Sequence, residues 1–172
     1  QEEGKLLSEG IELDALQQVI SLDNEGDVTD DDIFGSKEKR KVGDKWPVNK
    51  DKAIEDFRKY DIRMFADRFK GETKLAGVVK VRGHECLEVK GQFTVKDVQP
   101  PMNLPRGLRL TKSVMTGRMH SKLPVNPKLP ELENHMSMSL DIEITDRRNG
   151  TTLKRSLRMK SHAKIEPLKP GR

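Results

Sequence analysis

The 172-residue chain has few of the residues that usually stabilise small proteins. Cys86 is its single cysteine, so no disulfide bond can form within the chain. Aromatic residues make up 4% of the sequence and hydrophobic residues 33%, which suits only a modest core. No apolar run approaches the roughly 18 residues that a membrane-spanning helix requires, so no transmembrane segment is expected. A parallel sheet covered on both faces is also excluded, because its strands need continuous apolar runs.

Charged residues, in contrast, make up 35% of the chain and are unevenly distributed. Residues 1–34 contain eleven acidic residues and one lysine, a net charge of −10, so the remainder carries +15 within a total of +5. We interpret residues 1–41 as a solvated acidic leader with a short helix at 11–21 and a linker; the alternative is a leader that lies on the basic body. Residues 42–166 are predicted to form the folded domain and residues 167–172 a tail. The start at Gln1 indicates a processed or truncated product, through removal of a signal peptide or a cloning boundary.

The second half of the chain alternates apolar and charged residues with a period of two, the pattern of strands buried on one side. Every second residue from 136 to 144 is Met, Leu or Ile, and the intervening residues are polar or charged. Strands are predicted near residues 75–81, 84–98, 106–119, 135–146 and 151–164, with Leu75, Val79 and Val81 on one face. Helices are predicted at 50–60, capped by Asn49, and at 62–69. The predicted fold class is α+β: a curved, half-barrel-like antiparallel β-sheet of about five strands packed on one or two helices.

Local signals add detail to this fold. Arg82-Gly83 and Asn149-Gly150 are predicted turns, because glycine adopts positive φ without strain. Prolines at 124, 127 and 130 predict an extended connector before the last two strands. The single tryptophan, Trp46, is expected to anchor the start of the domain in the core.

The acidic leader contains a segment, Ser21–Asp32, whose spacing resembles that of a helix-loop-helix calcium site. Asp23, Glu25 and Asp32 occupy its third, fifth and twelfth positions. However, Ser21 replaces the first-position aspartate, and Asp32 is shorter than the usual twelfth-position glutamate. We therefore favour an acidic solvated turn over calcium binding.

Other candidates for chemistry are equally weak. His84 and Cys86 point to the same side of a predicted strand, but two ligands do not make a metal site, and the other three histidines lie far away in the sequence. A partly buried Cys86 beside a turn histidine is the favoured interpretation. Asp141 and Glu143 share a solvated strand face, where nothing adjusts a pKa for acid or base catalysis. The chain also lacks a strand-Ser-helix elbow and a glycine-rich phosphate loop, so we predict no enzyme activity, metal or cofactor.

The two faces of the predicted sheet are candidate binding surfaces. The apolar face is expected to pack on the helices and to admit an apolar small molecule or lipid, with an ordinary core as the alternative. Its residues are Leu87, Val89, Phe93, Met138, Leu140, Ile142, Leu157 and Met159. The basic face is a candidate for an acidic protein partner, with a solvated charged face as the alternative; nucleic acid is not expected, because no aromatic residue lies among the charges. Its residues are Lys90, Lys96, Lys154, Arg158, Lys160 and Lys164.

Two short motifs resemble those of a group of uncharacterised exported bacterial proteins. The first is Val42-Gly43-Asp44-Lys45-Trp46 before a helix, and the second is Gly71–Leu75 followed by Val81-Arg82-Gly83-His84-Glu85-Cys86 before a long strand. Residues 42–165 are thereby similar to the half-barrel folds of lipoprotein carriers. The resemblance implies a curved antiparallel sheet that wraps a helix, an acyl chain on its concave face, export to the periplasm or cell surface, and no catalytic residues.

Three functions follow, in order of preference. The first is a noncatalytic exported domain that binds an apolar or lipid ligand between sheet and helix. The second is an interaction or scaffold module that uses the basic face for an acidic partner. The third is an enzyme of unknown class, which would require a cleft with two or more convergent polar side chains.

Overall fold

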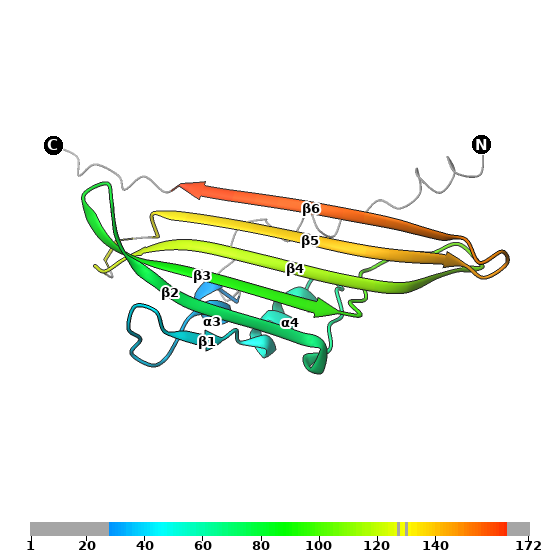
Figure 1. The fold of residues 1–172 in the computed structure, drawn as a ribbon, viewed down its shortest axis with the longest axis horizontal. Coiled ribbons are helices and arrows are strands. Elements are labelled where there is room, and N and C mark those ends of the chain that lie inside the picture. The colour runs from blue at the N-terminus through cyan, green and yellow to red at the C-terminus, as the bar shows by residue number, and fades with distance from the viewer. Residues whose placement is uncertain (1–27, 127, 130, 165–172) are drawn as a thin grey trace.

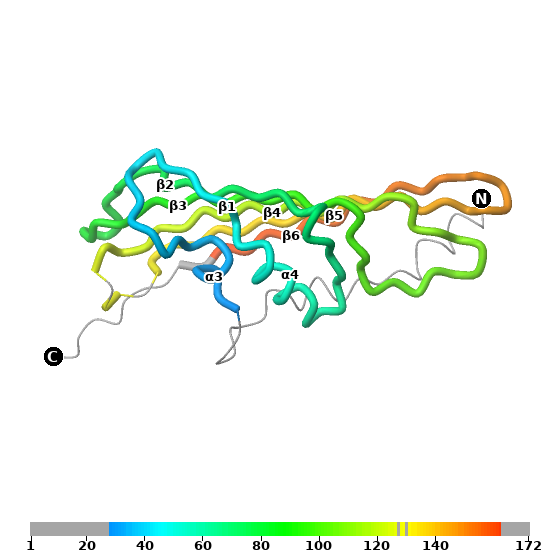
Figure 2. The backbone as a smooth tube through the Cα atoms, turned by 90° about the horizontal axis from the view of Figure 1, so that it is seen from below, coloured from blue at the N-terminus to red at the C-terminus, as the bar shows by residue number. Residues whose placement is uncertain are grey.

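The computed structural model describes residues 28–126, 128–129 and 131–164. Within them, the strands form one antiparallel sheet in the order β1-β2-β3-β4-β5-β6, each strand beside the next in sequence (Figure 1). The strands are β1 (Lys45–Pro47), β2 (Phe69–Val81), β3 (His84–Lys96), β4 (Leu108–Pro124), β5 (Glu133–Asp146) and β6 (Thr152–Lys164). The helices are α3 (Asp30–Phe34), α4 (Lys50–Arg58) and the 3-10 turn η1 (Ala66–Arg68). Both α-helices lie on the same side of the sheet (Figure 2).

The predicted fold class is wrong in its proportions. The described part of the chain is mostly β, with six strands and only one helix, α4, longer than two turns. The sixth strand is β1, whose three residues are too few to show an alternating pattern. The predicted α+β half-barrel of about five strands on one or two helices is therefore replaced by a single long antiparallel sheet.

The second predicted helix, at 62–69, is also wrong. Asp61 has a φ of 57°, which turns the chain out of the helical conformation directly after α4. The next residues are extended: Ile62 and Met64 are buried, and Arg63 pairs through its backbone with Gln99. The apolar residues at 62, 65, 66 and 69 match a helical spacing, but they lie in an extended segment, a 3-10 turn and the start of β2.

The helix predicted at 50–60 is confirmed as α4, which ends two residues earlier. Asn49 caps it as predicted, because its side chain accepts a hydrogen bond of 3.3 Å from the backbone N–H of Lys52. Ala53 and Phe57 form the buried stripe of the helix. The short helix predicted at residues 11–21 lies outside the described residues.

A β-bulge in β2 changes which side chains share a face. Leu75 stands opposite Val89, but the register shifts before Gly77, so Val79 stands opposite Cys86 on the other side of the sheet. The prediction that Leu75, Val79 and Val81 share a face is wrong, because one extra residue inverts the alternation. Val79 and Val81 instead pack with Cys86 and Leu132 in a small separate cluster.

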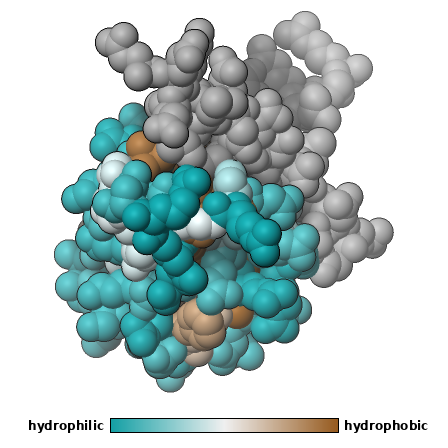
Figure 3. Space-filling model, turned by 90° about the vertical axis from the view of Figure 1, so that its right-hand side faces the viewer, coloured by the Kyte–Doolittle hydropathy of each residue, from teal (hydrophilic) through white to brown (hydrophobic). Residues whose placement is uncertain are grey.

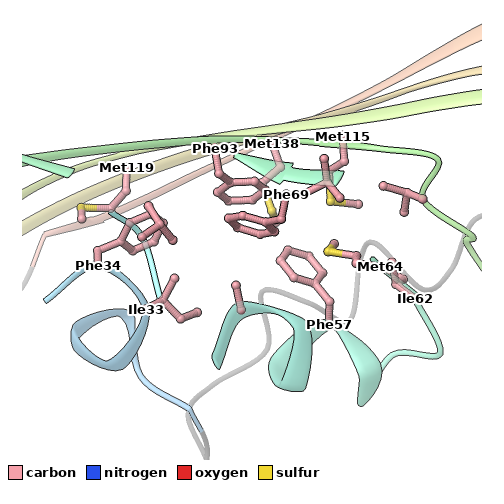
Figure 4. Packing of buried hydrophobic residues seen from close by; sticks show 14 of the residues in the cluster. Ile33, Phe34, Phe57, Ile62, Met64, Phe69, Phe93, Met115, Met119 and Met138 are labelled. Carbon is pink, nitrogen blue, oxygen red and sulfur yellow. The ribbon is translucent and has the colours of Figure 1, made fainter. Parts of the chain in front are cut away.

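The main core lies between the sheet and the two helices (Figure 4). The ring of Phe93 lies 5.3 Å from that of Phe69, 6.1 Å from Phe57 and 6.4 Å from Phe34. Gly117, directly opposite Phe93 in β4, leaves the space that this ring occupies. The predicted burial of Trp46 is confirmed, and its indole N–H donates a 2.8 Å hydrogen bond to the Phe34 carbonyl.

The end of the sheet that carries the turn between β5 and β6 is more hydrophilic than the core region (Figure 3). The view in Figure 3 faces this end and shows mostly hydrophilic residues with a few hydrophobic ones among them. Arg147, Arg148 and Asn149 are exposed in the turn between β5 and β6. No helix in the described part of the chain combines the length and the hydropathy needed to cross a membrane.

The close contact at Gly117 predicts a stability effect. A Cβ atom at this position would lie 2.2 Å from Cε1 of Phe93, whose ring is held by three other aromatic rings. We expect Gly117→Ala to lower the free energy of unfolding by about 1–3 kcal/mol, measured by urea denaturation. In the control Gly77→Ala, the new Cβ would meet only Glu88 Oε2, at 3.7 Å, and a change within about 0.5 kcal/mol is expected. Equal losses in both variants would contradict the packing argument.

Candidate functional site

A cavity of about 780 Å³ lies on the helix side of the sheet, next to α3. We call it the helix-side cavity. Phe34 and Trp46 line it from outside the long strands, and Leu75, Leu87 and Val89 line it from β2 and β3. Four methionines complete the apolar lining: Met119, Met136, Met138 and Met159.

The predicted apolar-face residues divide between this cavity and the core. Leu87, Val89, Met138 and Met159 line the helix-side cavity. Phe93, Leu140 and Ile142 are buried in the core, and half-buried Leu157 packs against it. The sequence analysis missed Phe34, because it stands at the end of the acidic leader, away from any alternating pattern.

One end of the cavity is polar. The side-chain amide of Asn134 donates to Asp30 Oδ2 at 2.8 Å and to Glu131 Oε2 at 3.3 Å. Glu131 also accepts a hydrogen bond from the Ser121 hydroxyl. The amide oxygen of Asn134 is buried and has no hydrogen-bond partner among the described residues. This end of the cavity therefore combines two carboxylates with an unused acceptor.

The segment considered for calcium has another role where it is described. Asp32 forms a capping box with Thr29 at the start of α3: Thr29 N–H donates to Asp32 Oδ2 at 3.0 Å, and Asp32 N–H donates to Thr29 Oγ1 at 3.2 Å. The hydrogen bonds that the backbone N–H and the hydroxyl of Thr29 donate to the Asp32 carboxylate hold its pKa below the ordinary value. Asp23 and Glu25 lie outside the described residues. Within those residues, no group of three or more His, Cys, Asp or Glu side chains has the geometry of a metal site.

The opposite face of the sheet, which we call the outer face, carries a row of six basic side chains, one from each strand. Each member stands directly opposite the next in the strand register. We call this the outer-face row, and it runs Lys45, Lys74, Lys90, His120, His135, His162. Because neighbouring strands lie about 4.8 Å apart, it spans roughly 24 Å.

The three histidine rings of the row lie close together. The ring centroids of His120 and His135 are 6.1 Å apart, and the rings of His135 and His162 stack at 3.7 Å. Desolvation and then the charges of His162 and His120 lower the pKa of His135. On the lysine side, Glu88 binds both Lys90 (3.1 Å) and His120 (2.8 Å), and its pKa is lowered, first by the bond with Lys90.

The predicted basic face lies on this outer face, but only Lys90 belongs to the row. Lys96, Lys154, Arg158 and Lys160 are exposed on the same side of the sheet, and the backbone of Lys164 stands opposite Glu133. The sequence analysis did not group the three histidines of the row, because they are far apart along the chain. The strand register, which sequence spacing does not show, brings them together.

The remaining candidates have structural partners. Cys86 is fully buried in the small cluster that it forms with Val79, Val81 and Leu132. Its thiol donates to the His84 carbonyl at 3.6 Å, whereas the His84 side chain is exposed. Asp141 accepts a hydrogen bond from Ser156, and Glu143 lies 3.4 Å from the ammonium of Lys112. Each of these two carboxylates therefore binds a side chain on a neighbouring strand, and the two do not converge in a cleft.

The fold and its two faces define a mostly-β protein: one antiparallel sheet with an apolar, helix-covered side and a basic outer side. Comparison of the chain with protein-family models, curated proteins and solved structures found no match. The resemblance to lipoprotein carriers therefore stays a prediction.

The lowered pKa of His135 predicts a pH dependence of stability. The folded protein holds a proton on His135 less readily than the unfolded chain, so the stabilising contribution exists above the unfolded pKa of about 6.5 and is lost as the pH falls below it. We expect the wild-type melting temperature to fall between about pH 7.5 and 5.5, and to fall less in His135→Gln. The lowered pKa of Glu88 acts only in a more acidic range, below its ordinary 4.5.

A second histidine supplies the control for this measurement. His84 is exposed at the start of β3, outside the outer-face row. His84→Gln should keep the wild-type pH dependence. If His135→Gln melts with an unchanged pH dependence, the row does not disfavour protonation in the folded state.

Proposed function

We propose that this protein is a noncatalytic binding domain that holds an apolar ligand in the helix-side cavity. The observation that carries the proposal is a space of about 780 Å³ beside a sheet face that is otherwise filled by core side chains. Ligand sites in proteins typically enclose about 300–1,000 Å³ and are lined mainly by apolar side chains with few polar groups. The helix-side cavity has a volume in this range and exposes more apolar than polar surface, although charged side chains such as Asp31, Glu38 and Arg40 also line it.

The methionines support an adaptable lining. Met119 and Met138 are buried, whereas Met136 and Met159 are only half-buried, so part of this surface is not filled by the described residues. Methionine has three rotatable bonds and a polarizable sulfur, and it adjusts to ligands of different shape. A set of four from β4, β5 and β6 suits a flexible hydrocarbon chain.

The polar end of the cavity indicates which head group the proposed ligand carries. The buried amide oxygen of Asn134 can accept a hydrogen bond from a hydroxyl or an amine. Asp30 and Glu131 beside it would repel a carboxylate and attract an ammonium group. The proposed ligand is therefore a single-chain lipid with a hydroxyl or amine head, rather than a free fatty acid.

The proposal includes export to the periplasm or the cell surface. Its support is the resemblance of residues 42–165 to exported carriers, in which such a face holds an acyl chain. Fractionation of the native host cell tests this part separately from ligand binding.

Thermal shift and calorimetry with three ten-carbon probes test the ligand. Decanol and decylamine should raise the melting temperature, since a ligand at 100 times its Kd stabilises the folded state by about 2.7 kcal/mol, whereas decanoate should bind at least about tenfold more weakly. Met136→Trp fills the cavity and should abolish the shift.

The matched control is Leu153→Trp. Leu153 stands opposite Ile144 on the same side of the sheet and is half-buried, but it does not line the cavity. This variant should keep the ligand response. The proposal fails if none of the probes stabilises the wild type, or if Leu153→Trp and Met136→Trp respond alike.

A further inference from the structure

We propose that the outer-face row is a binding site for a linear oligophosphate, and that its histidine half engages the ligand only when protonated. The row lies on the opposite side of the sheet from the helix-side cavity, so the inference does not rest on the proposed function. Three of its members are permanent cations, and the other three are histidines, which are cationic only when protonated.

The arrangement of the row is unfavourable for a surface that serves only solubility. Like charges directly opposite in a sheet destabilise it, yet Lys74 stands between Lys45 and Lys90. Elsewhere on the outer face opposite charges face each other, as where Glu133 binds Lys122. The row therefore departs from the pairing that stabilises the rest of this face.

The surroundings of the row leave it strongly cationic. Arg118 and Lys160 stand in the adjacent row across the sheet and line the same shallow hollow of about 660 Å³. The carboxylates near the row are Glu72, paired with Lys45, Glu88, and Glu133, paired with Lys122. Three carboxylates thus face six permanent cations before any histidine is protonated: the three lysines of the row, Arg118, Lys122 and Lys160.

Protonation of the histidines adds charge that the described side chains do not neutralise. His135 faces His120 from β4 and His162 from β6, and it has Glu133 as its charged neighbour on β5. The charged groups that flank the two facing histidines are basic: Arg118 and Lys122 on β4, and Lys160 on β6. Glu133 is already bound to Lys122, and Glu88, which also binds Lys90, contacts only His120 among the three histidines. Two imidazolium rings stacked at 3.7 Å would repel each other, and a bound anion would offset that repulsion.

The geometry favours a linear phosphate chain over other polyanions. An extended acidic peptide presents side chains on one face only every 6.6 Å or so, a poor match to cations about 4.8 Å apart. Single-stranded nucleic acid binds by stacking on aromatic side chains, and the strand residues on the described outer face include no Phe, Tyr or Trp. A flat membrane contacts a hollow less closely than a slender chain does. Each phosphate group of such a chain keeps at least one negative charge at pH 5.5, opposite in sign to the cations of the row.

Calorimetry with two inorganic probes tests the proposal. Pyrophosphate can reach only part of the row, whereas a polyphosphate of about ten phosphates can span both halves. We expect polyphosphate affinity to rise at least about tenfold from pH 7.5 to 5.5 with proton uptake, and pyrophosphate affinity to change much less. Proton uptake is measured by repeating the titration in buffers with different ionisation enthalpies.

Two variants separate the row from general electrostatics. His162 lies exposed on edge strand β6, so His162→Gln should fold and should lose most of the pH-dependent gain. His84→Gln removes a histidine outside the row and should behave as the wild type. An affinity that does not depend on pH, or equal losses in both variants, would overturn the proposal.

A further arm uses vesicles of phosphatidylglycerol at the same pH and salt. Binding to vesicles without binding to soluble polyphosphate would also overturn the proposal and point to a membrane surface. Binding to polyphosphate that is stronger than binding to vesicles, and lost in His162→Gln, supports the oligophosphate site.

Discussion

The strand register is the constraint on which the rest of this structure depends. Side chains alternate between the two faces of a strand, so a slip of one residue would move every apolar residue of that strand to the outer face. Burial of Leu140, Ile142 and Ile144 in the main core prevents such a slip in β5. The same register places His135 between His120 and His162. The core therefore determines the outer-face row, although the core side chains lie on the other face of the sheet.

Turns cooperate with the core in setting this register. Arg82 and Gly83 have φ values of 51° and 84°, and they close β2 and β3 with Val81 opposite His84, as the sequence predicted. At the other hairpin Gly150 has a φ of 72°, and Asp146 pairs through its backbone with Thr151. Both turns leave few alternative pairings for the long strands that they join.

The sequence carried enough information for the strands but not for their pairing. Period-two alternation located β3 to β6, because each places apolar residues on one face over many positions. It failed at β1, which is too short, and at the β2 bulge, which inverts parity without a local signal. For the candidate sites, four apolar residues of the cavity were visible in the alternation. The histidine row was not, because register is a property of two strands; pairing outward from the Asp146–Thr151 turn would have placed His135 opposite His162.

The two proposed sites are back to back across one layer of backbone. Met119, Met136 and Ser161 line the helix-side cavity, and each is the chain neighbour of a histidine in the row: His120, His135 and His162 respectively. A side-chain substitution on one face leaves the other site with its own contacts, since adjacent residues point in opposite directions. A change of twist or register acts on both sites at once, because they share the same hydrogen-bonded strands. The two sites therefore respond separately to side-chain substitutions but together to changes in the backbone. Both behaviours follow from the two-residue period of the strands.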